Sequence, residues 1–553
     1  MITYEFSDIK KKLFDARIDT RLKLLLITTC IAILQFLLHL GAMGFYGFHQ
    51  DELLYMALSE HLDWGYRETP PFIALVGVAG KFFFGGSIIG MRIIPALFAG
   101  AIVHLTGLIT IRLGGKQLAV ILSCTAVAFS AAFLATGALF IPQVFDEFFW
   151  LLCAYLMICW VQRPDDKILY VLGALAGVGL LVKYTILLYL IGLGIGILIV
   201  PEFRQLMKGS TLCIAFGITL IIITPHILWQ YEHSFPALWH YNELKRTQLV
   251  YLTRTDFLVQ QLVVNGTGIV LWLAGLWYFF RNDKLKSFRF LAVGFIFSMF
   301  SLAVLNGKPY YAFGAYPVLF AAGGIFFEQL LKRRTGLFIT FLVVPNLLLA
   351  VMVLPFLPIK TSSSVFTWTY QNLNLHFPLK WEDQKIHNVN QNYADMIGWE
   401  ELARKTSDFY LSLPLAQRKQ TVIFANGYGI AGALEHYRGS EYPLPSVVSL
   451  SSSFALWAPS RITAKHIIYF SSDKTDRFLS PNKQEIHGVI SNRYSGIYGT
   501  RICFLLYVGP EMKSWYESQW TEKKAGYGRP IRTSLMGYQL KFKRKIDELL
   551  ILF

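Results

Sequence analysis

Long apolar stretches, separated by short polar segments, follow one another from residue 22 to residue 356. A helix that crosses a membrane needs about 20 mostly apolar residues, because its backbone polar groups find no water in the hydrocarbon. Eleven spans fit this pattern, at 22–41, 88–111, 117–136, 143–161, 168–183, 184–200, 210–228, 259–280, 290–305, 311–331 and 336–356. The continuous run 168–200 is too long for one crossing, so we divide it near Lys183 and Tyr184. The pattern therefore predicts a polytopic α-helical membrane protein.

After residue 356 the apolar runs become shorter. Three of them have the length and composition of buried strands, at 421–425, 466–470 and 502–508. Helical stretches such as 398–411 accompany them. We expect a transmembrane domain at 1–356, with an outer loop at 41–87, and a C-terminal soluble α/β domain at 357–553.

Composition and charge agree with a membrane protein. Apolar types make up 54% and charged types 16% of the chain, whereas soluble proteins carry about 25% charged residues. The net charge of +16 would suggest nucleic acid in a soluble protein. Here lysine and arginine gather in alternate loops, as they do on the cytoplasmic side of membrane proteins. We expect no nucleic-acid partner, a multi-pass protein of the inner cell membrane, a cytoplasmic N-terminus and a periplasmic C-terminal domain.

Ionisable and tyrosine side chains gather at the outer ends of the predicted spans. They are Asp51, Glu52, Asp63, Tyr66, Arg67 and Glu68 in the outer loop, then Asp146, Glu147, Lys183, Tyr184, Lys308, Tyr310 and Tyr311. Such groups are costly near the membrane and often mark a functional cavity. Cations there can hold a phosphate, and a carboxylate can hold a hydroxyl nucleophile. Two members also have structural explanations, Lys183 as a snorkelling anchor and Asp146 as a helix N-cap.

In order along the chain, several motifs resemble GT-C fold glycosyltransferases, above all the group of protein O-mannosyltransferases and aminoarabinose lipid A transferases. The motifs are Asp51-Glu52, Asp63-Trp64-Gly65-Tyr66, Pro70-Pro71, Arg92-Ile93-Ile94-Pro95, Asp146, Lys183-Tyr184, Lys308-Pro309-Tyr310-Tyr311, Tyr316-Pro317, the segment 394–400 and the segment 426–434. The resemblance covers most of the chain, and its strength lies in the ordered set rather than in any one motif.

The resemblance implies an inverting enzyme that moves a sugar from a polyprenyl-phosphate carrier to an acceptor hydroxyl of a lipid, glycan or protein at the outer face of the membrane. Asp51 would be the catalytic base. Residues implied in donor or acceptor binding are Glu52, Tyr66, Arg67, Glu68, Arg92, Asp146, Lys183, Tyr184, Lys308, Tyr310 and Tyr311. Among them, Arg92, Lys183 and Lys308 would assist departure of the phosphate, and the tyrosines at 66, 310 and 311 would lie against the donor.

Two points stay open at this level. Relatives usually carry Lys or His just before the Pro-Pro pair, where this chain has Thr69, and Arg67 is the candidate for the missing charge. No cofactor is required, although Asp146, Glu147 and Glu68 are candidate ligands for a divalent metal ion.

Other functions fit fewer of the observations. A secondary transporter or a flippase of a lipid-linked substrate is the alternative, but transporters place ionisable groups near the bilayer midplane and are often built from repeats. Here the acids gather at one surface. The glycines at 427, 429 and 432 also match a dinucleotide-binding fingerprint. We set that match aside, because a turn between a strand and a helix explains the glycines equally well.

Overall fold

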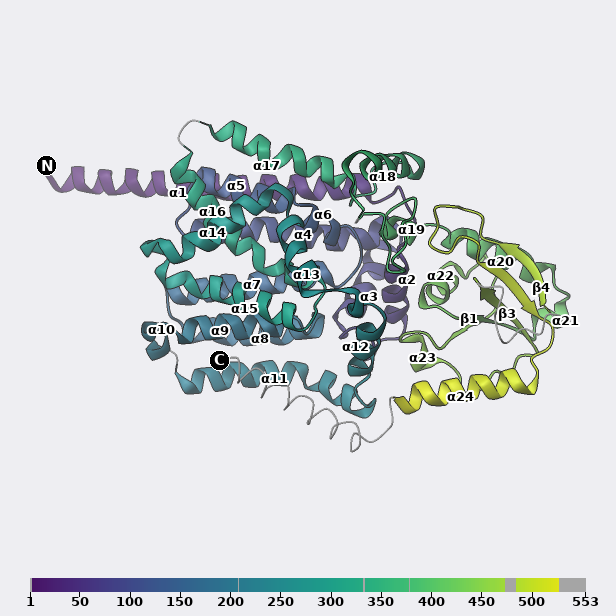
Figure 1. Ribbon diagram of the computed structural model, residues 1–553. Helices are drawn as coiled ribbons and strands as arrows, with labels where there is room; N and C mark the ends of the chain where they lie inside the picture. The colour runs from purple at the N-terminus through teal and green to yellow at the C-terminus, as the bar shows by residue number, and fades with distance from the viewer. Residues whose placement is uncertain (1, 207, 332–333, 377, 473–483, 527–553) are drawn as a thin grey trace.

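The computed structural model describes residues 2–206, 208–331, 334–376, 378–472 and 484–526. Most of the N-terminal part is a bundle of helices that lie side by side, and Figure 1 shows the sheet of the C-terminal region at one end of this bundle. The bundle helices are α1 (Ile2–Ala42), α4 (Ile88–Arg112), α5 (Gln117–Ala128), α6 (Ala131–Thr136), α7 (Gln143–Gln162), α8 (Asp166–Val182), α9 (Ile186–Leu198), α10 (Pro201–Leu206), α11 (Gly209–Glu232), α14 (Ile269–Arg281), α15 (Arg289–Val304), α16 (Tyr316–Leu330) and α17 (Thr335–Ala350). The chain is thus a multi-pass helical membrane protein.

Every predicted span contains helix, but not every one is a full crossing by length. Among the described residues, six helices are long and apolar enough to cross a membrane, or seven if the bent pair Arg254–Val263 and Gly266–Arg281 forms one span. That pair bends by 97°. Others are shorter than predicted: α9 has 13 residues, and such a helix rises about 20 Å, less than the hydrocarbon thickness of about 30 Å. The count of eleven therefore stays a prediction.

Shorter elements lie between the bundle and the C-terminal region. The outer loop 41–87 folds into α2 (Gln50–Glu60) and α3 (Phe72–Phe84), as Figure 1 shows. The remaining short elements are α12 (Pro236–Thr247), η1 (Leu249–Tyr251), α13 (Arg254–Val263), η2 (Gly266–Gly268), η3 (Asp283–Phe288) and η4 (Pro309–Ala315). Phe82 and Phe83 at the end of α3 are 80% and 72% exposed, as expected for side chains that face lipid.

The C-terminal region is a mixed sheet with helices around it. Its strands are β1 (Thr421–Ala425), β2 (Val447–Ser449), β3 (His466–Ser471), β4 (Gln484–Val489) and β5 (Arg501–Leu505), and the order is β2-β1-β3-β5-β4. β1 is parallel to β2 and β3, and β5 is antiparallel to β3 and β4. The helices are α18 (Ile359–Leu373), α19 (Gln391–Ala394), α20 (Trp399–Ser412), α21 (Leu415–Arg418), α22 (Tyr428–Tyr437), α23 (Phe454–Trp457) and α24 (Pro510–Gly526). Every residue of β1 is buried, as is typical of a central parallel strand.

One apolar core joins the two parts of the chain. A single cluster of buried residues extends from the bundle through Leu53 and Leu54 of α2 to Ala431 and Leu434 of α22. A second cluster packs Tyr46, just after α1, against residues beyond 357 such as Phe366. The division into two domains at residue 356 is still a prediction, and the contacts across it are extensive enough to fix α2 against the C-terminal region.

Candidate active site

Helix α2 places two adjacent carboxylates on different sides of its first turn. His49 is the N-cap, and its Nδ1 accepts a hydrogen bond from the backbone N–H of Asp51 at 3.1 Å. Glu52 completes a capping box by accepting from the backbone N–H of His49. Because consecutive helical residues point about 100° apart, the side chain of Asp51 is 39% exposed while Glu52 is fully buried.

Glu52 and Arg92 form an ion pair inside the protein. The Arg92 guanidinium donates to both Glu52 oxygens, at 3.0 and 2.6 Å, and the backbone N–H of Phe140 donates to Oε1 at 2.9 Å. Burial raises the pKa of Glu52, but Arg92 and the backbone donors outweigh it and leave the pKa below its usual value. Since Arg92 is 1% exposed, this geometry favours a structural role over the predicted contact with the donor.

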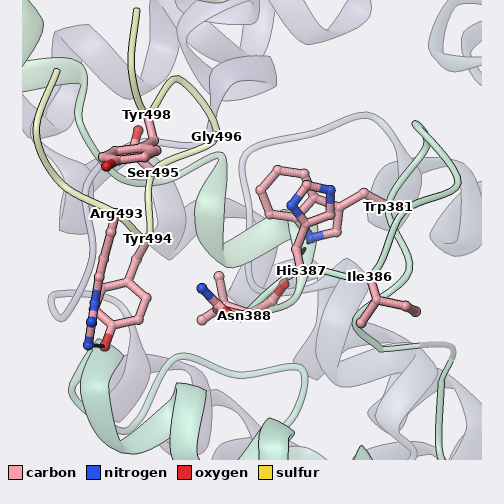
Figure 2. A pocket seen from close by; sticks show the side chains of 10 residues that line it. Trp381, Ile386, His387, Asn388, Arg493, Tyr494, Ser495, Gly496 and Tyr498 are labelled. Carbon is pink, nitrogen blue, oxygen red and sulfur yellow. Dashed lines mark hydrogen bonds between the residues drawn. The ribbon is translucent and has the colours of Figure 1, made fainter. Parts of the chain in front are cut away.

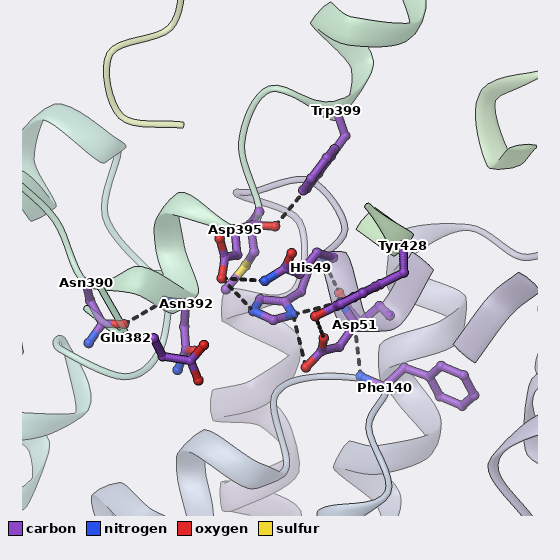
Figure 3. Close-up of polar contacts among 12 residues, drawn as sticks. His49, Asp51, Phe140, Glu382, Asn390, Asn392, Asp395, Trp399 and Tyr428 are labelled. Carbon is purple, nitrogen blue, oxygen red and sulfur yellow. Dashed lines mark hydrogen bonds and ion pairs between the residues drawn. The ribbon is translucent and has the colours of Figure 1, made fainter. Parts of the chain in front are cut away.

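Asp51, in contrast, meets the C-terminal region. The Tyr428 hydroxyl, at the start of α22, donates to Asp51 Oδ1 at 2.8 Å (Figure 3). Asp395 lies on the other side of His49, with its Oδ2 at 3.9 Å from Nε2, and accepts from the Gln50 amide at 2.8 Å. Burial outweighs the nearby His49 and raises the pKa of Asp395 to about 6. Neither Tyr428 nor Asp395 was assigned to the site from sequence, where both lay in motifs of the C-terminal region.

Two glycines allow α22 to lie directly against α2. A Cβ atom at Gly432 would be 3.0 Å from the backbone of Leu53, and one at Gly429 would be 3.1 Å from Gln50 and 2.9 Å from Trp399. Neither glycine has a positive φ, so the turn that we invoked from sequence does not explain them. Close helix packing does, and it carries Tyr428 to Asp51.

A second group of polar residues lies deeper, between α7, α8 and η4. Asp146 accepts from the Trp150 indole at 2.9 Å and from the Thr185 hydroxyl at 2.6 Å. It lies in the first turn of α7, whose N-cap is Pro142, so the N-cap explanation is wrong. Glu147 accepts from Thr136 at 3.1 Å.

Lys183 belongs to this deeper group and faces two aromatic rings. Its Nζ lies 4.3 Å from the ring centroid of Tyr311 and 5.0 Å from that of Tyr310. Its charge interacts with Asp146, Glu147 and Lys308. Within the described residues no carboxylate lies at ion-pair distance from Lys183, which leaves the ammonium available to a ligand.

Tyr55 connects the two groups. It follows Asp51 by one helical turn, so both side chains lie on the same side of α2. Burial raises the pKa of Tyr55, and the nearby Asp51, Glu68, Tyr310 and Tyr311 raise it further. Asp51 and the tyrosine pair thus both lie near Tyr55, and Lys183 faces the same two tyrosines. The i, i+4 spacing from Asp51 would have identified Tyr55 from sequence.

The remaining predicted residues have protein partners. The buried hydroxyl of Tyr66 accepts from the Asp63 N–H at 3.0 Å and lies 2.9 Å from the His61 carbonyl, which fixes the loop. Tyr184 contacts His226 at 2.7 Å. Both hydroxyls have protein partners, so the predicted contacts of Tyr66 and Tyr184 with the donor stay a prediction that this geometry does not favour.

Arg67, Glu68 and Lys308 surround His240 of α12. Arg67 pairs with Glu243, and the Lys308 ammonium lies 3.7 Å from Glu382. Burial lowers the pKa of His240, and the charges of Glu68, Arg67, Glu243 and Lys308 act on it. Glu68 accepts from the Ser453 hydroxyl through one oxygen, and its buried Oε1 has no protein partner in the described part of the chain. Sequence reasoning did not include His240 or Ser453.

The metal candidates do not form a ligand set. In the ranges that the structure describes, no three His, Cys, Asp or Glu side chains are arranged to hold a metal ion. Asp146 and Glu147 lie together in α7, whereas Glu68 lies in the loop before α3. A metal role for these residues stays a prediction that this geometry does not favour.

Residues 68–229 match the family of dolichyl-phosphate-mannose-protein mannosyltransferases. The lipid A galacturonosyltransferase RgtD of Rhizobium johnstonii is 24% identical over 254 residues, which are 43% of this chain and 50% of RgtD. The chain thus spans about half the length of that curated relative. Asp51 and Tyr428 lie outside the segment that matches the family.

Solved structures show the same architecture over most of the chain. ArnT from Cupriavidus metallidurans bound to undecaprenyl phosphate superimposes with a TM-score of 0.56 at 14% identity, over 88% of this chain and 99% of ArnT. The chain has the ArnT fold. ArnT in the apo state gives a TM-score of 0.55, also at 14% identity and over 88% of this chain and 98% of ArnT. The resemblance to GT-C glycosyltransferases that the sequence suggested is confirmed, and at this identity the likeness to ArnT establishes the fold.

Proposed function

We propose that this protein transfers a sugar from a polyprenyl-phosphate carrier to an acceptor hydroxyl at the outer face of the membrane. The observation that carries the proposal is the position of Asp51. It is a partly exposed carboxylate with one oxygen held by Tyr428, and it lies on the same side of α2 as Tyr55. The family match and the ArnT fold, seen in a structure that contains undecaprenyl phosphate, support the same activity.

In this reaction Asp51 acts as the general base. The acceptor oxygen attacks the sugar C1 from the face opposite the phosphate, the C1–O bond to the phosphate breaks, and the hydroxyl proton passes to Asp51. The configuration at C1 is therefore inverted. A phosphate leaves without an acid catalyst because it is already a weak base, so one carboxylate suffices, unlike the two of glycoside hydrolases.

Lys183 is the cation that we assign to the departing phosphate. Its ammonium lies over Tyr310 and Tyr311 without a carboxylate at ion-pair distance in the described residues. We do not assign Arg92 to this role, because its guanidinium forms an ion pair with Glu52. A well-placed donor of this kind is typically worth about 3 kcal/mol in the transition state.

The acceptor that we propose is a lipid-linked glycan such as lipid A. RgtD, which the chain resembles over part of its length, is a lipid A galacturonosyltransferase. The N-terminus would lie in the cytoplasm, with the sheet region and Asp51 on the opposite side, as the distribution of lysine and arginine predicts. Eleven crossings, some by short helices, remain part of this proposal.

The Asp51→Asn variant tests the proposal. It should fold and insert normally but lose roughly 100- to 10,000-fold in sugar transfer, the usual range for a general base. The measurement is release of undecaprenyl phosphate together with mass spectrometry of the acceptor glycan. Asp63→Asn is the matched control, since Asp63 is an exposed carboxylate of the same loop. Near-normal transfer by Asp51→Asn would remove Asp51 from this role, and lipid-linked sugar moved across the membrane without transfer would favour a flippase.

A further inference from the structure

A separate hollow of about 270 Å³ opens in the C-terminal region. Two segments line it: residues 381–389, which precede α19, and residues 493–498, which follow β4. Figure 2 shows Trp381 and His387 on one side of it and Arg493 and Tyr494 on the other. Its volume suits one small ring-shaped molecule or one unit of a larger ligand.

One wall of the hollow is an aromatic platform. The rings of Trp381 and His387 are stacked, with centroids 3.7 Å apart and planes at 13°. The Trp381 indole N–H donates to the Val389 carbonyl at 2.8 Å, and His387 lies 2.9 Å from Asp383. These contacts hold both rings in place, so the platform is ready before a ligand arrives.

The opposite wall carries a cation and hydrogen-bonding groups. The Arg493 guanidinium lies 4.9 Å from the Tyr494 ring centroid and donates to the Tyr494 hydroxyl at 2.7 Å. The Arg493 side chain is exposed, and within the described residues no carboxylate pairs with it. Asn388 and Tyr498, both exposed, add an amide and a hydroxyl to the rim.

The charges around the hollow leave room for an anion. Asp383 is the nearest acid of its own segment, and its carboxylate is taken up by His387. Glu382 points to Lys308. Among the described residues, no acid lies at ion-pair distance from Arg493, and its planar fork matches a carboxylate or a phosphate.

The geometry points to a binding site for an anionic saccharide. Apolar faces of sugar rings pack on aromatic rings, sugar hydroxyls pair with amide and hydroxyl groups, and a carboxylate or phosphate on the sugar pairs with Arg493. This inference rests on the proposed function, because we assign the bound saccharide to the acceptor.

The hollow and Asp51 are linked through Asp395. Gly496 lines the hollow, its N–H donates to the Ala394 carbonyl at 2.9 Å, and a Cβ atom there would be 2.5 Å from Asp395 Oδ1. The other carboxylate oxygen of Asp395 accepts from Gln50, next to Asp51. An acceptor glycan that occupies the hollow would thus lie beside the segment that touches the catalytic helix.

Binding of defined disaccharides tests this assignment in the full-length Asp51→Asn protein in detergent, where turnover is absent. Equilibrium dialysis would compare digalacturonate, a glucosamine disaccharide phosphate and the neutral galactose disaccharide. We expect at least one anionic probe to bind about tenfold more tightly than the neutral one, as a charge-assisted hydrogen bond would provide. The first two probes distinguish a carboxylate from a phosphate.

Two variants locate the binding. Arg493→Gln should remove the preference for the anionic probe, and Trp381→Ala should weaken all three probes about tenfold. Arg461→Gln is the matched control, because Arg461 is an exposed arginine of the same region that lies 3.8 Å from Glu517. Its binding should equal that of the parent.

Equal binding of anionic and neutral probes, or equal losses in Arg493→Gln and Arg461→Gln, would overturn the assignment. The result is separable from the proposed function. Full transfer by Asp51→Asn together with Arg493-dependent binding would refute the catalytic base and leave the saccharide site. An inactive Asp51→Asn with no saccharide binding would refute the saccharide site alone.

Discussion

The helical bundle and the C-terminal region contribute to the site in opposite ways. In the buried part of the molecule, Arg92 of the bundle forms an ion pair with Glu52 of α2. The C-terminal region instead donates hydrogen bonds from Tyr428 and Ser453 to two other acids, Asp51 and Glu68. The comparison teaches that neighbouring acids of one loop can be held in two ways, by a buried cation or by neutral hydroxyl donors from a distant part of the chain.

The largest effect on stability is expected at the buried ion pair between Glu52 of α2 and Arg92 of the bundle. Glu52→Gln leaves the Arg92 cation buried without a counter-charge, which should cost about 3–5 kcal/mol. Glu60→Gln, in the same helix, breaks only the exposed pair with Lys81 and should cost under about 1 kcal/mol. Thermal unfolding in detergent measures both. Similar melting temperatures for the two variants would break the comparison.

A somewhat smaller effect is expected where the two regions touch. Gly432→Val forces a side chain against the Leu53 backbone, and overpacking of this kind costs about 1–3 kcal/mol. Transfer activity should fall as well, because α22 can no longer hold Tyr428 on Asp51. Gly439→Val is the control, since nothing lies within 4 Å of a Cβ at that position. Unchanged activity in Gly432→Val would show that the helix contact is dispensable.

The single hydrogen bond between the regions should have a moderate effect. Tyr428→Phe removes the donor to Asp51 and should lower kcat roughly tenfold, with little change in KM for the lipid-linked donor. Tyr437→Phe in the same helix is the control, and its kcat should equal that of the parent. An unchanged kcat in Tyr428→Phe would show that this hydrogen bond is dispensable.

The last effect depends on pH and concerns Asp395. Its pKa is raised to about 6 from an ordinary value of 3.8, so the folded state holds the proton more tightly than the unfolded chain. The stability that this proton provides is present below about pH 4 and is lost as the pH rises through about 6, a change of at most about 3 kcal/mol. Asp395→Asn should flatten the dependence of melting temperature on pH between 4 and 7. An equally steep dependence in the variant would assign it to other groups.

Much of the fold was readable from local pattern. The strands predicted at 421–425 and 466–470 and the helix predicted at 398–411 agree with the structure to within one residue at each end. The strand predicted at 502–508 spans Arg501–Leu505, so it ends three residues earlier. The strand Val447–Ser449 was missed because three residues give too little pattern, and Gln484–Val489 because its apolar residues are few. The span predicted at 117–136 is interrupted before α6, at Phe129 and Ser130, a break that composition alone does not reveal.

Several members of the candidate site could be named from the sequence, but their pairings could not. Asp51 and Lys183 were selected for charge near the membrane, and in the structure Lys183 lies over Tyr310 and Tyr311. The partner of Glu52 lies 40 residues away, and that of Asp51 lies 377 residues away. Periodicity carries no information at such separations. The sequence therefore could not show which of the two acids, Asp51 or Glu52, would have its charge compensated by a cation.

The fit of α22 on α2 limits how this protein can be recombined with its relatives. A chimaera that receives a foreign C-terminal region keeps Asp51 but places beside it a helix shaped for another surface. We expect such exchanges to yield active protein only when α2 is exchanged together with the C-terminal region. The segment that must be kept together for activity thus includes both a helix of the outer loop and the sheet region.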